Sequence, residues 1–144
     1  MKKLLCALAM VMTMSFGSMC FAADGGDLNA EQKTAETFIS VFAGQEVPSY
    51  EDFTKGFSDE LKTAVTEQAY SKMQRDVKVQ MGTMKDAKFY SFQRFDQEDR
   101  VTYIASFDSA NLVAIVLSFD KEQKMTNFAL TPMQQQNQQA VPAK

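Results

Sequence analysis

Residues 101–119, VTYIASFDSANLVAIVLSF, contain two β-prone runs on either side of a polar turn. The first run spans Val101 to Phe107, and residues 108–111 are turn-forming Asp, Ser, Ala and Asn. The second run, Leu112 to Phe119, is almost continuously apolar, which is typical of a central strand that is covered on both faces. We therefore expect two neighbouring strands of a buried sheet in this stretch.

Further strands are predicted on both sides of this pair. Residues 87–95 are aromatic and β-prone, and the charged residues 96–99 separate them from the strand that starts at Val101. A second polar turn at residues 120–124 is followed by a last apolar run, residues 125–130. The order of runs and short turns predicts a four-stranded antiparallel meander.

Helical periodicity precedes the strands. Asn29 and Gln32 have the spacing of a capping box, and the helix that they start should end near Gly44. A second helix, or a bent pair broken near Gly56, covers residues 53–65. Thr66 is the expected N-cap of a third helix, and Gly82 follows its end; each helix carries one apolar stripe, such as Ala35, Phe38, Ile39 and Phe42 in the first.

Segregated helices followed by strands indicate the α+β class, with three N-terminal helices packed on one face of the sheet. The continuous apolar run at residues 112–119 means that the second face also needs a cover. Curvature of the sheet, a ligand or a second subunit in a homodimer through the sheet face would each supply one.

The first 22 residues resemble a secretory signal peptide: Lys2 and Lys3 precede an apolar run, and small residues follow. We expect cleavage between Ala22 and Ala23, which leaves a protein that is exported to the periplasm or the medium without a membrane span. An uncleaved anchor and a lipid on Cys20 are the alternatives, although Met19 is an unusual residue before a lipidated cysteine. Residues 23–29 then form a flexible spacer, residues 30–131 the domain, and residues 132–144 a disordered glutamine-rich tail.

Composition excludes several function classes. Of 15 basic residues, Lys2 and Lys3 lie in the predicted signal, so 13 face 18 acidic residues in the mature chain, a net charge of −5 that disfavours nucleic acid as a partner. The whole chain has no His and no Trp, and its two cysteines, Cys6 and Cys20, lie in the predicted signal. These absences disfavour His-based triads, thiol nucleophiles and zinc sites, and no motif indicates a cofactor.

A set of diffuse positions resembles the family named domain of unknown function 3887. The resemblance covers residues 30–131 and rests on apolar and turn positions: Ala43-Gly44, Phe53, Phe57-Ser58, Glu60-Leu61-Lys62, Val65-Thr66, Gly82, Val113 to Phe119-Asp120, and Lys124-Met125. It implies the cone-shaped cystatin-like fold typified by nuclear transport factor two, either as an exported single domain or as an extension of a serine hydrolase. The family's pattern assigns no catalytic residue. Two positions depart from it, because Met73 or Val77 stands where the family has tryptophan and Asn127 where it has glycine.

Candidate site residues are few. Tyr90, Phe92 and Tyr103 lie on predicted strands and are the candidates for lining an apolar pocket between the helices and the sheet. Asp96, Glu98 and Asp99 lack the ligand spacing of a calcium loop, so we interpret them as a solvated turn and predict no metal site. Arg94 and the other scattered basic residues are interpreted as surface charge.

Three functional hypotheses follow. The first is a non-catalytic exported domain that binds a small apolar ligand or a protein partner. The second is an isomerase or dehydratase that uses a carboxylate beside a tyrosine, which requires an acidic side chain deep in a cleft. The third is an envelope interaction protein that binds its partner through the glutamine-rich tail.

Overall fold

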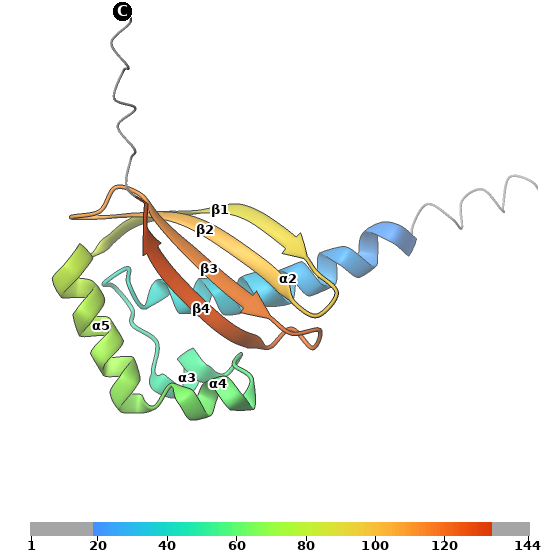
Figure 1. Cartoon of the computed structure of the whole chain (residues 1–144), viewed down its shortest axis with the longest axis horizontal. Coiled ribbons are helices and arrows are strands. Elements are labelled where there is room, and N and C mark those ends of the chain that lie inside the picture. Colours follow the sequence, from blue (N-terminus) through green and yellow to red (C-terminus); the bar gives the residue numbers. More distant parts are fainter. Residues whose placement is uncertain (1–18, 134–144) are drawn as a thin grey trace, which may run out of the picture.

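The computed structural model describes residues 19–133, with side chains from residue 26 onward. Four helices precede four strands in this part of the chain: α2 Met19–Ser40, α3 Tyr50–Thr54, α4 Asp59–Ala64, α5 Glu67–Met81, β1 Met84–Arg94, β2 Asp99–Phe107, β3 Val113–Phe119 and β4 Met125–Pro132. The strands form one antiparallel sheet in the order β1-β2-β3-β4, which is not closed into a barrel (Figure 1). The predicted α+β class with a four-stranded meander is confirmed.

The predicted start of the first helix at Asn29 is wrong. Helix α2 begins at Met19 and continues through residues 23–29, which we expected to form a spacer. Glycine in a helix costs only about 1 kcal/mol relative to alanine, so Gly25 and Gly26 weaken the helix without ending it. The predicted cleavage site, Ala22 to Ala23, falls within α2, whereas residues 1–18 and 134–144 lie outside the described residues.

Side-chain caps divide the next segment into three helices. Ser49, Ser58 and Thr66 each accept a hydrogen bond from the backbone N–H three residues further on, at the starts of α3, α4 and α5. The predicted break near Gly56 and the predicted cap at Thr66 are confirmed. Gly82 follows α5 with a φ of 82°, a backbone conformation that favours glycine.

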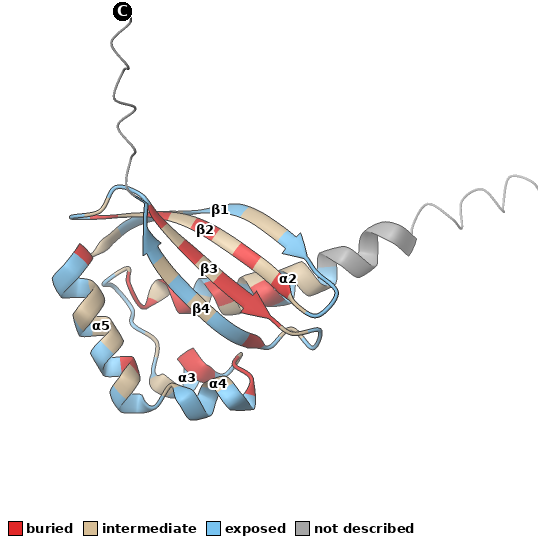
Figure 2. Cartoon of the chain, in the orientation of Figure 1, coloured by how far each residue is buried: buried red, intermediate tan, exposed pale blue. Residues whose placement is uncertain are grey.

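The core lies between α2 and the sheet. The Phe38 side chain is fully buried, and its ring centroid lies 5.6, 5.5 and 4.8 Å from those of Phe42, Phe53 and Phe128. Buried residues run along α2 and the central strands (Figure 2). Alternate residues of β2 and β3 form the sheet side of this core: Val101, Tyr103, Ala105, Phe107, Val113, Ile115, Leu117 and Phe119.

The outer face of the same two strands is half-buried. Thr102 and Ile104 of β2 and Ala114 and Val116 of β3 alternate with the core residues and keep part of their surface exposed. Leu112, which we placed in this strand, precedes β3 and is exposed. A homodimer through this face stays a prediction.

Candidate functional site

Two carboxyl side chains are buried where the middle of α2 meets one end of the sheet. Glu31 of α2 has no exposed surface, and Asp99, the first residue of β2, is 2% exposed. Burying an ionised carboxylate without a partner costs free energy, so each of these groups must either be paired with a cation or a hydrogen-bond donor, or stay protonated. Asp99 was interpreted as part of a solvated turn, and that interpretation is wrong because α2 and the turn between β3 and β4 cover it.

Basic groups compensate Asp99 and its neighbour Asp27. Lys121, in the turn between β3 and β4, donates to Asp99 Oδ1 at 2.6 Å, and Arg94 Nε lies 3.5 Å from the same oxygen. Arg94 also donates to Asp27 Oδ2 at 3.0 Å. Gln123 donates to Asp27 Oδ1 at 3.2 Å. Arg94 therefore bridges the helix and the sheet and is more than the simple surface charge that we predicted.

Unlike Asp27 and Asp99, Glu31 has no basic or amide partner in this cluster. Neither of its carboxylate oxygens has a hydrogen-bonding partner, although both are buried. The pKa of Glu31 is raised from 4.5 to about 7, and burial is the largest cause. The Asp99 carboxyl contributes to this rise by its charge and as an acceptor for a protonated Glu31, the Asp27 charge contributes less, and Arg94 acts in the opposite direction.

The raised pKa of Glu31 determines whether it can hydrogen-bond to Asp99. Two ionised carboxylates are both acceptors and cannot hydrogen-bond to each other, whereas a protonated Glu31 can donate to Asp99. The described residues contain no group of acidic side chains able to hold a metal ion, and the cluster already holds two cations of its own. None of the cavities described below is lined by Glu31 or Asp99.

Sequence reasoning did not single out Glu31, although a signal was present. Glu31, Ala35, Phe38 and Phe42 are spaced four, three and four residues apart, which is the spacing of one buried helix face. A carboxyl side chain on an apolar stripe must therefore be buried or must break the stripe. Its partner Asp99 could not be identified in the same way, because only the fold brings residues 31 and 99 together.

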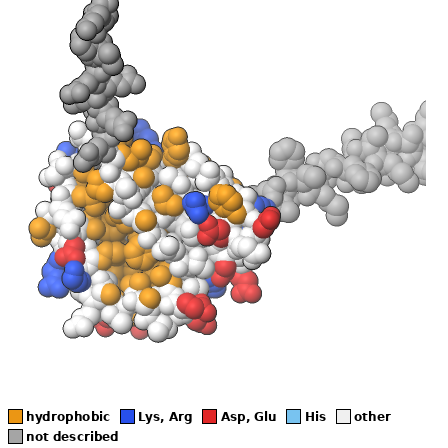
Figure 3. Space-filling model, in the orientation of Figure 1, with side chains coloured by type: hydrophobic (Ala, Val, Ile, Leu, Met, Phe, Trp, Pro, Cys, Tyr) orange, Lys and Arg blue, Asp and Glu red, His pale blue; other side chains and the backbone are white. Residues whose placement is uncertain are grey.

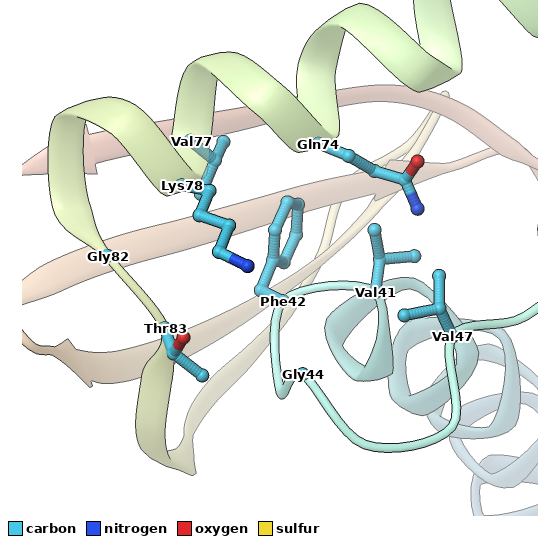
Figure 4. A pocket seen from close by; sticks show the side chains of 9 residues that line it. All are labelled: Val41, Phe42, Gly44, Val47, Gln74, Val77, Lys78, Gly82 and Thr83. Atoms are coloured by element: carbon cyan, nitrogen blue, oxygen red, sulfur yellow. The ribbon is translucent and has the colours of Figure 1, made fainter.

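A separate apolar cavity of about 270 Å³ opens between α5 and the turn after α2. Val77, Lys78 and Gln74 of α5 face Val41, Phe42 and Val47 across it (Figure 4). The Phe42 ring lies in the middle of the view, and the Lys78 ammonium group extends toward it (Figure 4). The cavity thus combines apolar walls with one cationic group.

Apolar surface continues along the other side of α5. Hydrophobic side chains gather over the space between α5 and β4 (Figure 3). Both elements contribute half-buried side chains that pack against the core there, Met73 and Val77 from α5 and Phe128 and Leu130 from β4. Val77 belongs both to this strip and to the cavity, so the two apolar features meet at α5.

Two further cavities are polar or shallow. One lies beside α2 and is lined by Lys33, Thr34, Thr37, Asp52, Phe53, Lys55 and Gly56. The other, beside α4 and the turn between β3 and β4, is lined mostly by charged side chains, among them Asp59, Lys62, Asp120 and Lys121. Mixed charge without an apolar wall does not indicate a class of ligand.

The structure separates the three aromatic residues that we predicted to line a pocket. Tyr90 is the additional residue in a bulge of β1 and is 71% exposed. Phe92 is half-buried, with the Arg94 guanidinium 5.6 Å from its ring centroid. Tyr103 is buried in the core beside Phe89, and this burial raises the pKa of its hydroxyl. None of the three lines any of the three cavities described above.

Among residues 19–133, no helix is both long enough and apolar enough to cross a membrane.

Neither a curated protein nor a solved structure matches the chain. The family described as protein of unknown function (DUF3887) matches residues 35–128, which include the last part of α2, the other helices and most of the sheet. Since this match covers well over half of the 144 residues, the chain belongs to that family.

Proposed function

We propose that this domain is a non-catalytic binding module that holds a small apolar ligand with an anionic end in the cavity between α5 and the turn after α2. The observation that carries the proposal is the apolar wall formed by Val41, Phe42, Val47 and Val77 beside the Lys78 ammonium group. Ligand sites are typically concave and mostly apolar, with a few polar groups that fix orientation. A volume of about 270 Å³ favours a small ligand.

The proposal is tested with octanoate and its cationic counterpart octylamine, measured by isothermal titration calorimetry. We expect octanoate to bind more tightly, because its chain contacts the apolar wall and its carboxylate faces Lys78. Lys78→Met keeps much of the side-chain length and removes the charge, so it should reduce this preference about two- to fivefold, the size expected for an exposed charge pair.

A matched pair on α5 tests the apolar wall. Val77→Glu places a charge in the cavity and should weaken octanoate binding about tenfold or more. Val79→Glu makes the same change on the opposite side of the helix, where the side chain is 86% exposed, and should leave binding unchanged. Equal binding of octanoate and octylamine, or equal effects of the two glutamates, would contradict the proposal.

We also propose that the chain is exported and processed between Ala22 and Ala23. The order of basic, apolar and small residues in the first 22 positions supports this. Intact mass spectrometry of the protein from its own host should give the mass of residues 23–144. A mass that includes Met1, or a lipid on Cys20, would contradict this processing.

A carboxylate enzyme is the second candidate, because Glu31 is a buried acid with a pKa of about 7. Neither of its oxygens meets a tyrosine hydroxyl, and no described cavity reaches it, so the binding proposal accounts for more of the structure. Uptake of solvent deuterium beside the carbonyl of a ketone probe, abolished by Glu31→Gln, would favour the enzyme.

A further inference from the structure

We propose that Glu31 and Asp99 form a proton-operated latch that fastens the middle of α2 to one end of the sheet and loosens when Glu31 loses its proton. The latch does not depend on the proposed ligand, since neither residue lines the cavity beside α5. It rests on the buried, unpartnered carboxylate of Glu31 and on the charged groups of α2 and three other segments gathered around it.

The groups around Glu31 come from every part of the chain that meets there. Asp27 lies one turn earlier on α2, Arg94 ends β1, Asp99 begins β2, and Lys121 lies with the neutral Gln123 in the turn between β3 and β4. Arg94 and Gln123 hold Asp27, while Lys121 and Arg94 hold Asp99. Hydrogen bonds and an ion pair therefore hold α2 to the sheet at Asp27, one turn before Glu31.

The charge balance of the cluster depends on the Glu31 proton, and this balance determines how strongly α2 is held against the sheet. Among the described side chains of this cluster, two carboxylates face two cations when Glu31 is protonated, and Glu31 can then donate a hydrogen bond to Asp99. With Glu31 ionised, three carboxylates face the same two cations, and the added charge is enclosed in protein. Hydration relieves that charge only if α2 moves away from the end of the sheet.

The direction of the pH effect follows from the raised pKa. The folded protein keeps the Glu31 proton up to about pH 7, whereas the unfolded chain releases it near 4.5. Between these values the folded state binds more protons than the unfolded state, so stability falls as the pH rises. The latch is therefore strongest below about pH 4.5, weakens as the pH rises toward 7, and is weakest above about pH 7.

Hydrogen exchange of residues 26–33, measured by mass spectrometry, tests the latch on the protein as its host produces it. Glu31→Gln mimics the protonated acid, because its amide can donate to Asp99 at any pH. Wild type and variant should exchange equally at about pH 4, below the unshifted pKa of 4.5, and the wild type should exchange at least about tenfold faster at pH 8, above the shifted pKa. Comparison at the same pH cancels the intrinsic pH dependence of exchange.

Glu36→Gln is the matched control, since Glu36 is an exposed acid on the same helix, and it should exchange like the wild type at both values. Equal exchange of wild type and Glu31→Gln at pH 8 would overturn the latch. So would faster exchange of the variant at both pH values, because the charge would then be stabilising.

A carbon-13 NMR titration of the Glu31 carboxyl in the wild-type protein gives a second readout that needs no variant. A midpoint near 7 supports the latch, and a midpoint near 4.5 overturns it.

Discussion

Gly82 ends α5 in a conformation that other residues rarely adopt. Its φ is 82°, and a Cβ atom built on it would lie 2.7 Å from the Cβ atom of Asp108. Asp108 in turn accepts a hydrogen bond from the Thr83 N–H at 2.9 Å, so the two chain segments meet closely. We expect Gly82→Ala to lower the free energy of unfolding by about 1–3 kcal/mol, because the backbone is strained and Asp108 must move.

Gly26 provides a control for the same substitution. It lies within α2, and a Cβ atom there would have no neighbour within 4 Å. Gly26→Ala should therefore raise the free energy of unfolding by roughly 0.5–1 kcal/mol, the gain in helix propensity. Urea denaturation followed by circular dichroism measures both variants, and effects of the same sign would contradict the argument.

Glu31 illustrates how far one residue can be interpreted before the fold is known. Its place on the stripe with Ala35 and Phe38 indicates burial, because those positions recur on one helix face. Its pKa could not be derived from that spacing. The value of about 7 depends first on burial and then on the Asp99 carboxyl, which is distant in sequence and is brought close only by the packing of α2 on the sheet.

Helix α5 depends on its N-terminal cap. The Thr66 hydroxyl accepts a hydrogen bond from the Ala69 N–H at 3.2 Å, and one turn of helix later the Tyr70 hydroxyl donates to the Pro48 carbonyl at 2.6 Å. We expect Thr66→Ala to lower the free energy of unfolding by about 1 kcal/mol, since the Ala69 N–H loses its acceptor. Thr66→Ser keeps the hydroxyl, so its free energy of unfolding in urea denaturation should stay close to that of the wild type. If Thr66→Ser lowers the free energy of unfolding as much as Thr66→Ala does, the methyl group and not the cap is responsible.

Elements with clear local signals were predicted better than those without. Thr66, Gly82 and the turns between strands were identified because capping oxygens, glycine and short polar runs act on the residues beside them. The start of α2 was wrong, because Asn29 and Gln32 form a capping box only where the preceding residues leave the helix. Strand β1 begins at Met84, three residues before the prediction, because pairing with β2 extends it.

The whole molecule should unfold in one cooperative step. A single cluster of buried residues includes α2, α3, α5 and three of the four strands, so none of these elements can separate without exposing the core. Far-ultraviolet circular dichroism should report the helices and tyrosine fluorescence the core, and the two urea transitions should coincide. Separate midpoints would mean that α5 or α2 unfolds independently of the sheet.

At this scale, local chemistry in the chain accounts for the class and order of the elements, and long-range packing accounts for the candidate sites. The helical and alternating periods, the caps and the turns depend on near neighbours, so the α+β meander and the family could be inferred from residues 30–131 alone. The cavity at Val77 and the cluster around Glu31 each join residues from distant parts of the chain. Which distant side chains meet, and how far water is excluded from them, depends on how α2 and α5 pack on the sheet, and one chain's residue pattern does not encode those distances directly.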